Sequence, residues 1–86
     1  MWNIKNGIVK FYELRVGGAN HHVIDTCCFI IRNIVGANNC LVRIDGNAAY
    51  IKFKAGLIQY RNIMKELDRL NGSLMPLGVF MAVNEF

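Results

Sequence analysis

Residues 40–54, which read CLVRIDGNAAYIKFK, decide the fold that we expect. Two runs rich in strand-forming residues, 40–45 and 48–54, flank Asp45-Gly46-Asn47. An Asp-Gly pair between two such runs is a strong signal for a tight β-hairpin. Because side chains alternate along a strand, the second run has an apolar side and a side with cations and an aromatic ring. The first side carries Ala49, Ile51 and Phe53, and the second carries Tyr50, Lys52 and Lys54.

The sequence around the hairpin predicts two helices and two further strands. Residues 8–16 alternate as a strand does, and Gly17-Gly18 follows them. Asn20 is a candidate N-cap for a helix over residues 21–35, and Gly36 is a natural residue to end it. Residues 57–70 carry apolar side chains at helical spacing, and we expect Asn71-Gly72 to stop that helix. Residues 79–83 predict the last strand.

The resulting order is strand, helix, strand, strand, helix, strand. Right-handed crossovers place both helices on the same face of one sheet. We therefore predict an α+β, ferredoxin-like βαββαβ fold: a four-stranded antiparallel sheet with two helices on one face. A chain of 86 residues is too short for two independent cores, so we expect residues 1–86 to form a single domain.

Composition limits the possible classes of protein. Ten basic and six acidic residues give a net charge of +4, which favours an anionic partner, and 53% of the residues are hydrophobic. No apolar run is long enough to cross a membrane, and no signal-peptide pattern follows Lys5. The three cysteines are an odd number, and two of them are adjacent. This pattern predicts reduced thiols and an intracellular, cytoplasmic protein.

The sheet face opposite the helices is where we expect function. In the first strand Val9 and Phe11 make the better core pair, which would leave Lys10 and Tyr12 outward. Aromatic rings interleaved with cations on a flat sheet are typical of single-stranded RNA binding, and we expect no acidic residue at the centre of this face. The predicted RNA-binding residues are Lys10, Tyr12, Arg43, Tyr50, Lys52, Lys54 and Phe80.

Residues 49–83 resemble the RNA recognition motif. Ala49-Tyr50-Ile51-Lys52-Phe53 matches the last five positions of that family's signature octamer. Residues 67–72 look like the end of its second helix, and Val9-Lys10-Phe11-Tyr12-Glu13-Leu14 is a looser match to its first-strand hexamer. The resemblance implies RNA binding, with Tyr50 as a stacking residue. The sequence departs from the pattern where Gly46 replaces a basic residue, Ala48 and Lys10 replace stacking rings, and Glu13 replaces an asparagine.

A second hypothesis is a protein-interaction or inhibitor module, such as the small regulators that viruses and mobile elements encode. The helix over residues 21–35 has a wide apolar face, and Phe29 lies beside that face together with Arg32. Such a module would contact its partner through this helix, with Phe29 and Arg32 at the interface, or through a sheet edge. A homodimer is one form that this contact could take.

Catalysis and metal binding are the weakest hypotheses. Residues 15–20 faintly resemble the phosphate loop of acylphosphatases, but no residue matches the catalytic asparagine of that family. The adjacent pairs His21-His22 and Cys27-Cys28 do not have the spacing at which zinc ligands normally reach one ion. We therefore expect no enzymatic activity, no cofactor and no metal.

Overall fold

The structure is a computed structural model that describes residues 8–18, 20–74, 76 and 78–86, apart from the side chains of Leu74 and Phe80. Its elements follow the predicted order. They are β1 (Val9–Gly17), α2 (His21–Val35), a short 3-10 turn η1 (Ala37–Asn39), β2 (Cys40–Asp45), β3 (Ala48–Gly56), α3 (Leu57–Leu74) and β4 (Phe80–Glu85).

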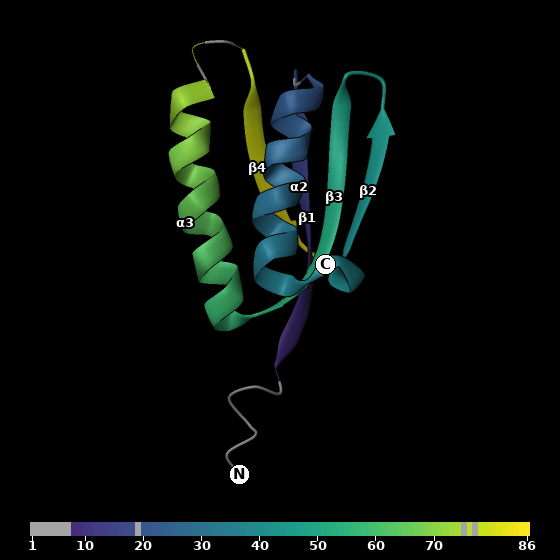
Figure 1. Cartoon of the computed structure of the whole chain (residues 1–86), viewed down its shortest axis with the longest axis vertical. Coiled ribbons are helices and arrows are strands. Elements are labelled where there is room, and N and C mark those ends of the chain that lie inside the picture. The colour runs from purple at the N-terminus through teal and green to yellow at the C-terminus, as the bar shows by residue number, and fades with distance from the viewer. Residues whose placement is uncertain (1–7, 19, 75, 77) are drawn as a thin grey trace.

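The four strands form one sheet in the order β2-β3-β1-β4, and every neighbouring pair is antiparallel. Figure 1 shows both helices in front of the same sheet face, with α2 over the middle of the sheet and α3 beside it. The predicted α+β architecture with a four-stranded antiparallel sheet and two helices is confirmed. The strand order is consistent with the ferredoxin-like prediction.

Local sequence signals explain where α2 begins and ends. The side chain of Asn20 accepts a hydrogen bond from the Val23 N–H at 3.1 Å, as an N-cap does. At the other end, Gly36 has a φ of 91° and donates its N–H to the Arg32 carbonyl. A positive φ is easy for glycine, so this position ends the helix cleanly. Both predicted ends of this helix are confirmed.

The predicted end of the second helix is wrong. Helix α3 continues through Asn71 and Gly72 to Leu74. The hydroxyl of Ser73 donates to the Leu70 carbonyl at 2.8 Å, within this last part of the helix. A glycine inside a helix costs only about 1 kcal/mol relative to alanine, so packing and local hydrogen bonds can carry the helix through it.

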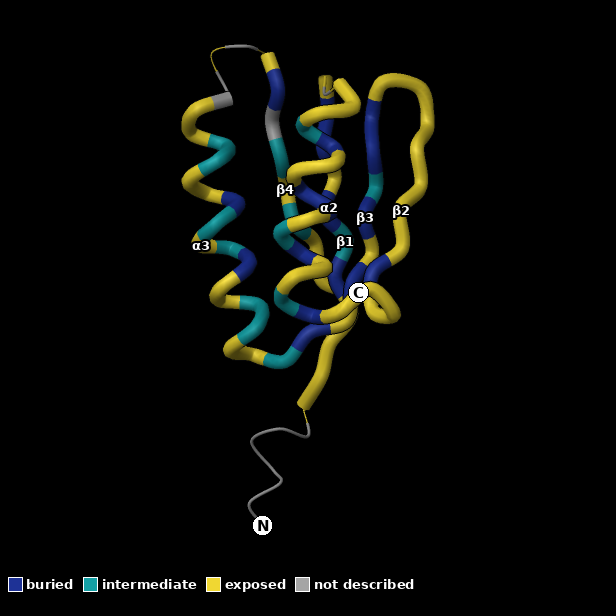
Figure 2. The backbone as a smooth tube through the Cα atoms, in the orientation of Figure 1, coloured by how far each residue is buried: buried dark blue, intermediate teal, exposed yellow. Residues whose placement is uncertain are grey.

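The core lies between the sheet and the two helices. Phe53 and Ile51 of β3 pack with Leu14 of β1, Ile31 of α2 and Ile63 of α3, and all five side chains are buried. Figure 2 shows buried positions concentrated in β1 and β3, whereas most of β2 is exposed. The structure confirms that Ile51 and Phe53 are buried and that Lys52 and Lys54 point outward.

The predicted orientation of β1 is wrong. Tyr12 is only 6% exposed, whereas Phe11 is 57% exposed, so the helix-facing side of β1 carries Tyr12, Leu14 and Val16. The Tyr12 ring stacks on Tyr60, with centroids 4.4 Å apart, and on Phe53, at 5.4 Å. Val9 lies on the same side of β1 as Phe11, away from the helices, and is 42% exposed, while Figure 1 shows the start of β1 extending beyond the helices. Across the described residues, no helix is both long and apolar enough to cross a membrane.

Candidate nucleic-acid interface

The sheet face away from the helices is built from all four strands. Strand pairing sets Tyr50 beside both Arg15 and Arg43, and it sets Lys52 beside Glu13 and Leu41. Lys54 lies opposite Phe11. The members of this open face in β1, β2 and β3 are Val9, Phe11, Glu13, Arg15, Leu41, Arg43, Asp45, Tyr50, Lys52 and Lys54. The expectation of no central acid is wrong, because Glu13 lies between Lys52 of β3 and Asn84 of β4.

Three cations on the open face lie over aromatic rings. The Arg43 guanidinium is 4.3 Å from the centroid of the Tyr50 ring. The Lys52 ammonium is 5.0 Å from the Phe86 centroid, and that of Lys54 is 6.0 Å from the Phe11 centroid. Phe86 is held beside β1 because its N–H donates to the Phe11 carbonyl at 2.9 Å. These contacts place three rings and three positive charges on one surface.

Two open hollows lie next to each other on this face, around Phe11 and Lys52. The first, of about 360 Å³, is lined by Phe11, Leu41, Phe53, Lys52, Lys54, Asn38 and Asn39. The second, of about 330 Å³, is lined by Phe11, Tyr12, Lys52 and Phe86. Phe11 and Lys52 line both hollows, so an apolar ring and a cation separate two shallow depressions. Hollows of this kind can receive flat apolar groups while leaving charged groups at the surface.

The structure brings together four of the predicted RNA-binding residues: Arg43, Tyr50, Lys52 and Lys54. Tyr12 does not join them, because it belongs to the core. Lys10 shares the helix-facing side of β1 with Tyr12, and its ammonium lies 3.3 Å from the Glu85 carboxylate. The backbone of Phe80 pairs with Gly17, but its side chain lies outside the described part of the structure.

Sequence reasoning missed Phe11 and Phe86 on this face. The signal for Phe11 was present in the second half of the strand, where Leu14 and Val16 alternate with Glu13 and Arg15. An apolar pair alternating with charged residues fixes the buried side, and Phe11 falls on the other side. Phe86 lies three residues beyond the predicted last strand, 79–83, so no alternation pattern indicates where its side chain points.

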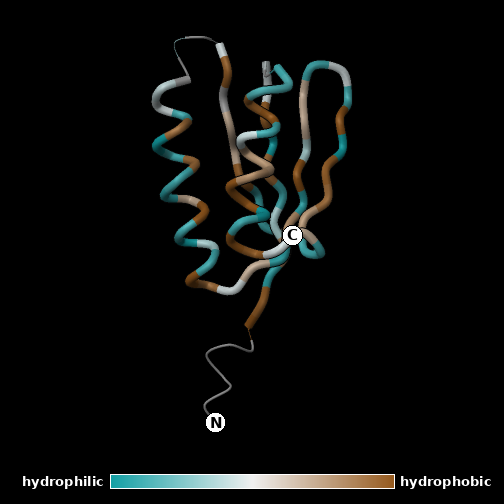
Figure 3. The backbone as a smooth tube through the Cα atoms, viewed as in Figure 1, coloured by the Kyte–Doolittle hydropathy of each residue, from teal (hydrophilic) through white to brown (hydrophobic). Residues whose placement is uncertain are grey.

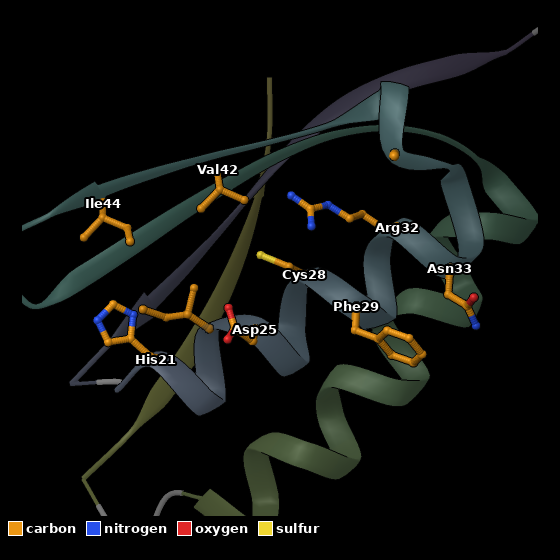
Figure 4. A pocket seen from close by; sticks show the side chains of 10 residues that line it. His21, Asp25, Cys28, Phe29, Arg32, Asn33, Val42 and Ile44 are labelled. Carbon is orange, nitrogen blue, oxygen red and sulfur yellow. The ribbon is translucent and has the colours of Figure 1, made fainter.

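The predicted protein-interface residues, Phe29 and Arg32, lie at a second site. They line a groove of about 520 Å³ between α2 and β2, together with Cys28, Val42, Ile44 and neighbouring polar residues. Figure 4 shows Cys28 and Arg32 directed toward β2, whereas Phe29 points away from the strand. Phe29 is 68% exposed. Its role in an interface stays a prediction.

The three cysteines are buried free thiols. Burial raises the pKa of Cys27 to about 11, and the neighbouring Cys28 adds to this shift. Burial also raises the pKa values of Cys28 and Cys40, although the positive charge of Arg32 partly opposes it at both. A thiol must ionise to act as a nucleophile or metal ligand, so these environments disfavour both roles. The described residues include no group of three or more histidine, cysteine or acidic side chains placed to hold a metal ion.

Comparison with known proteins gives no family assignment. The sequence matches no protein-family model, and a search of curated proteins returned no match.

Proposed function

We propose that this protein is a non-enzymatic, ferredoxin-like domain similar to the RNA recognition motif, which binds single-stranded RNA on its open sheet face. The observation that carries the proposal is the set of three cation–aromatic pairs on the face that α2 and α3 leave uncovered. Each pair offers both groups that an unstacked nucleotide needs. The ring takes the base, and the cation takes the phosphate.

The chemistry of each pair suits a nucleotide that arrives from solvent. Lysine and arginine have long flexible stems, so their charged ends can move from the ring to a phosphate when a base takes their place. Base stacking on an aromatic side chain contributes about 1–3 kcal/mol per base. Tyr50 is half-buried, which holds its ring in place, and it is the strongest stacking candidate.

Phe11 supplies a first-strand ring on the open face, although not at the position given by the hexamer match. That family stacks bases on rings from its first and third strands, and the loose sequence match put Lys10 at the first-strand position. The observed register instead turns Phe11 to the open face beside Lys54 of β3. Phe11 and Tyr50 are therefore rings on neighbouring strands β1 and β3. Glu13 repels phosphate, so we propose that the RNA backbone runs past the β2–β3 side of the face.

Fluorescence anisotropy with short labelled RNAs tests this proposal. We expect Tyr50→Ala and Phe11→Ala each to weaken binding by about 5- to 150-fold, the loss that removal of one stacked base predicts. We expect Lys52→Ala/Lys54→Ala to weaken binding as well, and to make it less sensitive to salt.

Matched variants on the helices serve as controls. Phe29→Ala removes a phenylalanine of similar exposure from α2, and Arg61→Ala/Lys65→Ala removes two positive charges from the exposed surface of α3. These controls should bind as the wild type does. The proposal is wrong if the wild type binds no RNA, or if the open-face variants and the helix variants lose affinity equally. Capture of a protein partner that survives nuclease treatment, without RNA binding, would favour the protein-interaction hypothesis.

A further inference from the structure

Strand β2 is an edge of the sheet with apolar side chains exposed on both of its faces. It pairs with β3 on one side only. Leu41 on the open face is 71% exposed, while Val42 and Ile44 on the helix-facing side are 36% and 54% exposed. Comparison of Figures 2 and 3 shows that much of this strand is both exposed and hydrophobic. An edge of this composition is a template for pairing with another strand.

The usual protections of an edge strand are missing from β2. Residues 40–45 contain no proline and no lysine, and their two charges, Arg43 and Asp45, are opposite and lie 3.8 Å apart. The strand is therefore neutral overall, although the chain carries a net charge of +4. A second β2 strand would meet no net repulsion at this edge, unlike at the cationic open face.

We propose that two copies of this chain pair through β2, antiparallel, with Val42 of one copy opposite Val42 of the other. The helix-facing side of the strand carries Cys40, Val42 and Ile44, an apolar row that is symmetric about Val42. A second copy in this register places apolar side chains opposite apolar side chains along the whole row. On the open face, each exposed Leu41 then lies opposite Arg43 of the second copy, whose aliphatic stem can cover it.

Other registers fit less well, and pairing centred on Leu41 keeps only residues 40–42 of β2 paired strand to strand. Pairing centred on Arg43 places two guanidinium groups directly opposite each other, and like charges in that position are destabilising. Pairing centred on Ile44 leaves only residues 43–45 paired strand to strand, because Gly46 and Asn47 form the hairpin turn. The register centred on Val42 keeps residues 40–44 paired throughout. Its two Arg43 side chains are diagonal neighbours, and each stays beside its own Asp45.

The groove between α2 and β2 supports this contact. Figure 4 shows Val42 and Ile44 pointing from the strand toward α2, over the groove that Cys28, Arg32 and Asp25 also line. In the proposed pair, Ile44 and Cys40 of the second copy continue this apolar row past the edge. Each exposed side chain of β2 then has a neighbour from the second copy on the same face, and two four-stranded sheets become one continuous sheet.

Sedimentation equilibrium without RNA tests the proposal, and its outcome is independent of RNA binding. The average mass of the wild type should rise from 9.7 kDa toward twice that value as concentration increases. Val42→Lys and Val42→Glu each place two like charges opposite each other, so each alone should self-associate at least about tenfold more weakly. An equimolar mixture of these two variants should dimerise again, because lysine then faces glutamate.

The control charges are placed on α3. Ile58 is 73% exposed there, and Ile58→Lys and Ile58→Glu should dimerise as the wild type does. Far-ultraviolet circular dichroism confirms that each variant is folded before it is mixed. A wild type that stays at 9.7 kDa up to its solubility limit overturns the proposal, and so do Val42 variants that associate as strongly as the wild type. Single variants that are monomeric, but whose mixture is also monomeric, overturn the pairing centred on Val42.

Discussion

At the scale of single residues, Cys27 is a group whose ionisation depends strongly on folding. Its side chain is fully buried in α2, and its thiol lies 3.9 Å from the sulfur of Met81. Burial raises its pKa from 9.0 to about 11, since a thiolate would lose its hydration there. The native protein therefore keeps this proton at a pH where the unfolded chain has lost it.

This difference predicts a loss of stability in alkali. The free energy of unfolding contains the full contribution of Cys27 below pH 9.0 and loses it progressively as the pH rises to about 11. The loss should be on the order of 2 kcal/mol. Urea unfolding at a series of pH values measures it, and Cys27→Ala should show a smaller fall over the same interval. An equal fall in both proteins would contradict this explanation.

Tyr12 makes a second prediction at this scale. Because its ring is buried between Tyr60 and Phe53, Tyr12→Ala should lower the free energy of unfolding by about 3–5 kcal/mol, the usual cost of removing a buried aromatic side chain. Phe11→Ala, at the neighbouring exposed position, should change stability far less. Chemical denaturation of both variants decides the matter. Similar losses for the two would mean that β1 does not have the orientation seen here.

At the scale of elements, the glycines in two turns differ in the space around them. Gly18 follows β1 with a φ of 71°, and a Cβ atom there would lie 2.6 Å from the carbonyl oxygen of Gly78. Gly46 in the β2–β3 hairpin has a similar φ of 65°, but no heavy atom lies within 4 Å of its Cβ position. The hairpin needs only glycine's backbone freedom, whereas the turn after β1 also needs its lack of a side chain.

The two turns should therefore respond differently to alanine. Gly46→Ala should cost about 1–2 kcal/mol, the price of a left-handed backbone for an ordinary residue. Gly18→Ala has the same backbone cost and must also push the backbone at residue 18 away from that at Gly78. The melting temperature of this variant should therefore be clearly lower than that of Gly46→Ala. Thermal unfolding of the pair measures the difference. Equal melting temperatures would show that the chain around Gly78 moves without cost.

The sequence predicted most elements because their ends depend on local chemistry. Asn20 and Gly36 bracket α2, and Asp45-Gly46-Asn47 gives the hairpin, all within a few residues of the structure they set. The first half of β1 is ambiguous, because Phe11 and Tyr12 are adjacent aromatic residues that point to opposite sides. The buried Leu14 and Val16 in the second half fix the orientation, so comparing Val9 and Phe11 with Lys10 and Tyr12 alone gave the wrong side.

At the scale of the whole molecule, charge and exposed rings coincide on one face. The sequence predicted the β2 and β3 part of that face, since alternation after the hairpin is unambiguous for Tyr50, Lys52 and Lys54. It could not predict that Phe86 lies against Lys52, because this contact depends on the register between β4 and β1. The β2 and β3 part of the candidate site thus follows from local alternation, whereas the contact between Lys52 and Phe86 follows from how β4 pairs with β1.

This distribution of charge predicts the salt dependence of RNA binding. If Arg43, Lys52 and Lys54 each neutralise one phosphate, the logarithm of the association constant should fall with the logarithm of salt concentration with a slope of about −2. Lys52→Ala/Lys54→Ala should leave one phosphate contact, so the magnitude of the slope should fall below about 1. Titrations between about 50 and 200 mM salt measure both values. A slope near zero for the wild type would exclude phosphate contacts as the source of affinity.

The central place of β1 has a consequence for how the chain folds during synthesis. This strand is the first to be made, yet its two neighbours are β3 and β4, and Gly17 pairs with Phe80 across most of the sequence. Contacts between distant residues slow folding, and a strand without neighbours is prone to mispairing. A nascent chain that has not yet released residues 80–85 from the ribosome therefore holds β1 with one edge open. We expect the final sheet to close only after residues 80–85 have left the ribosome.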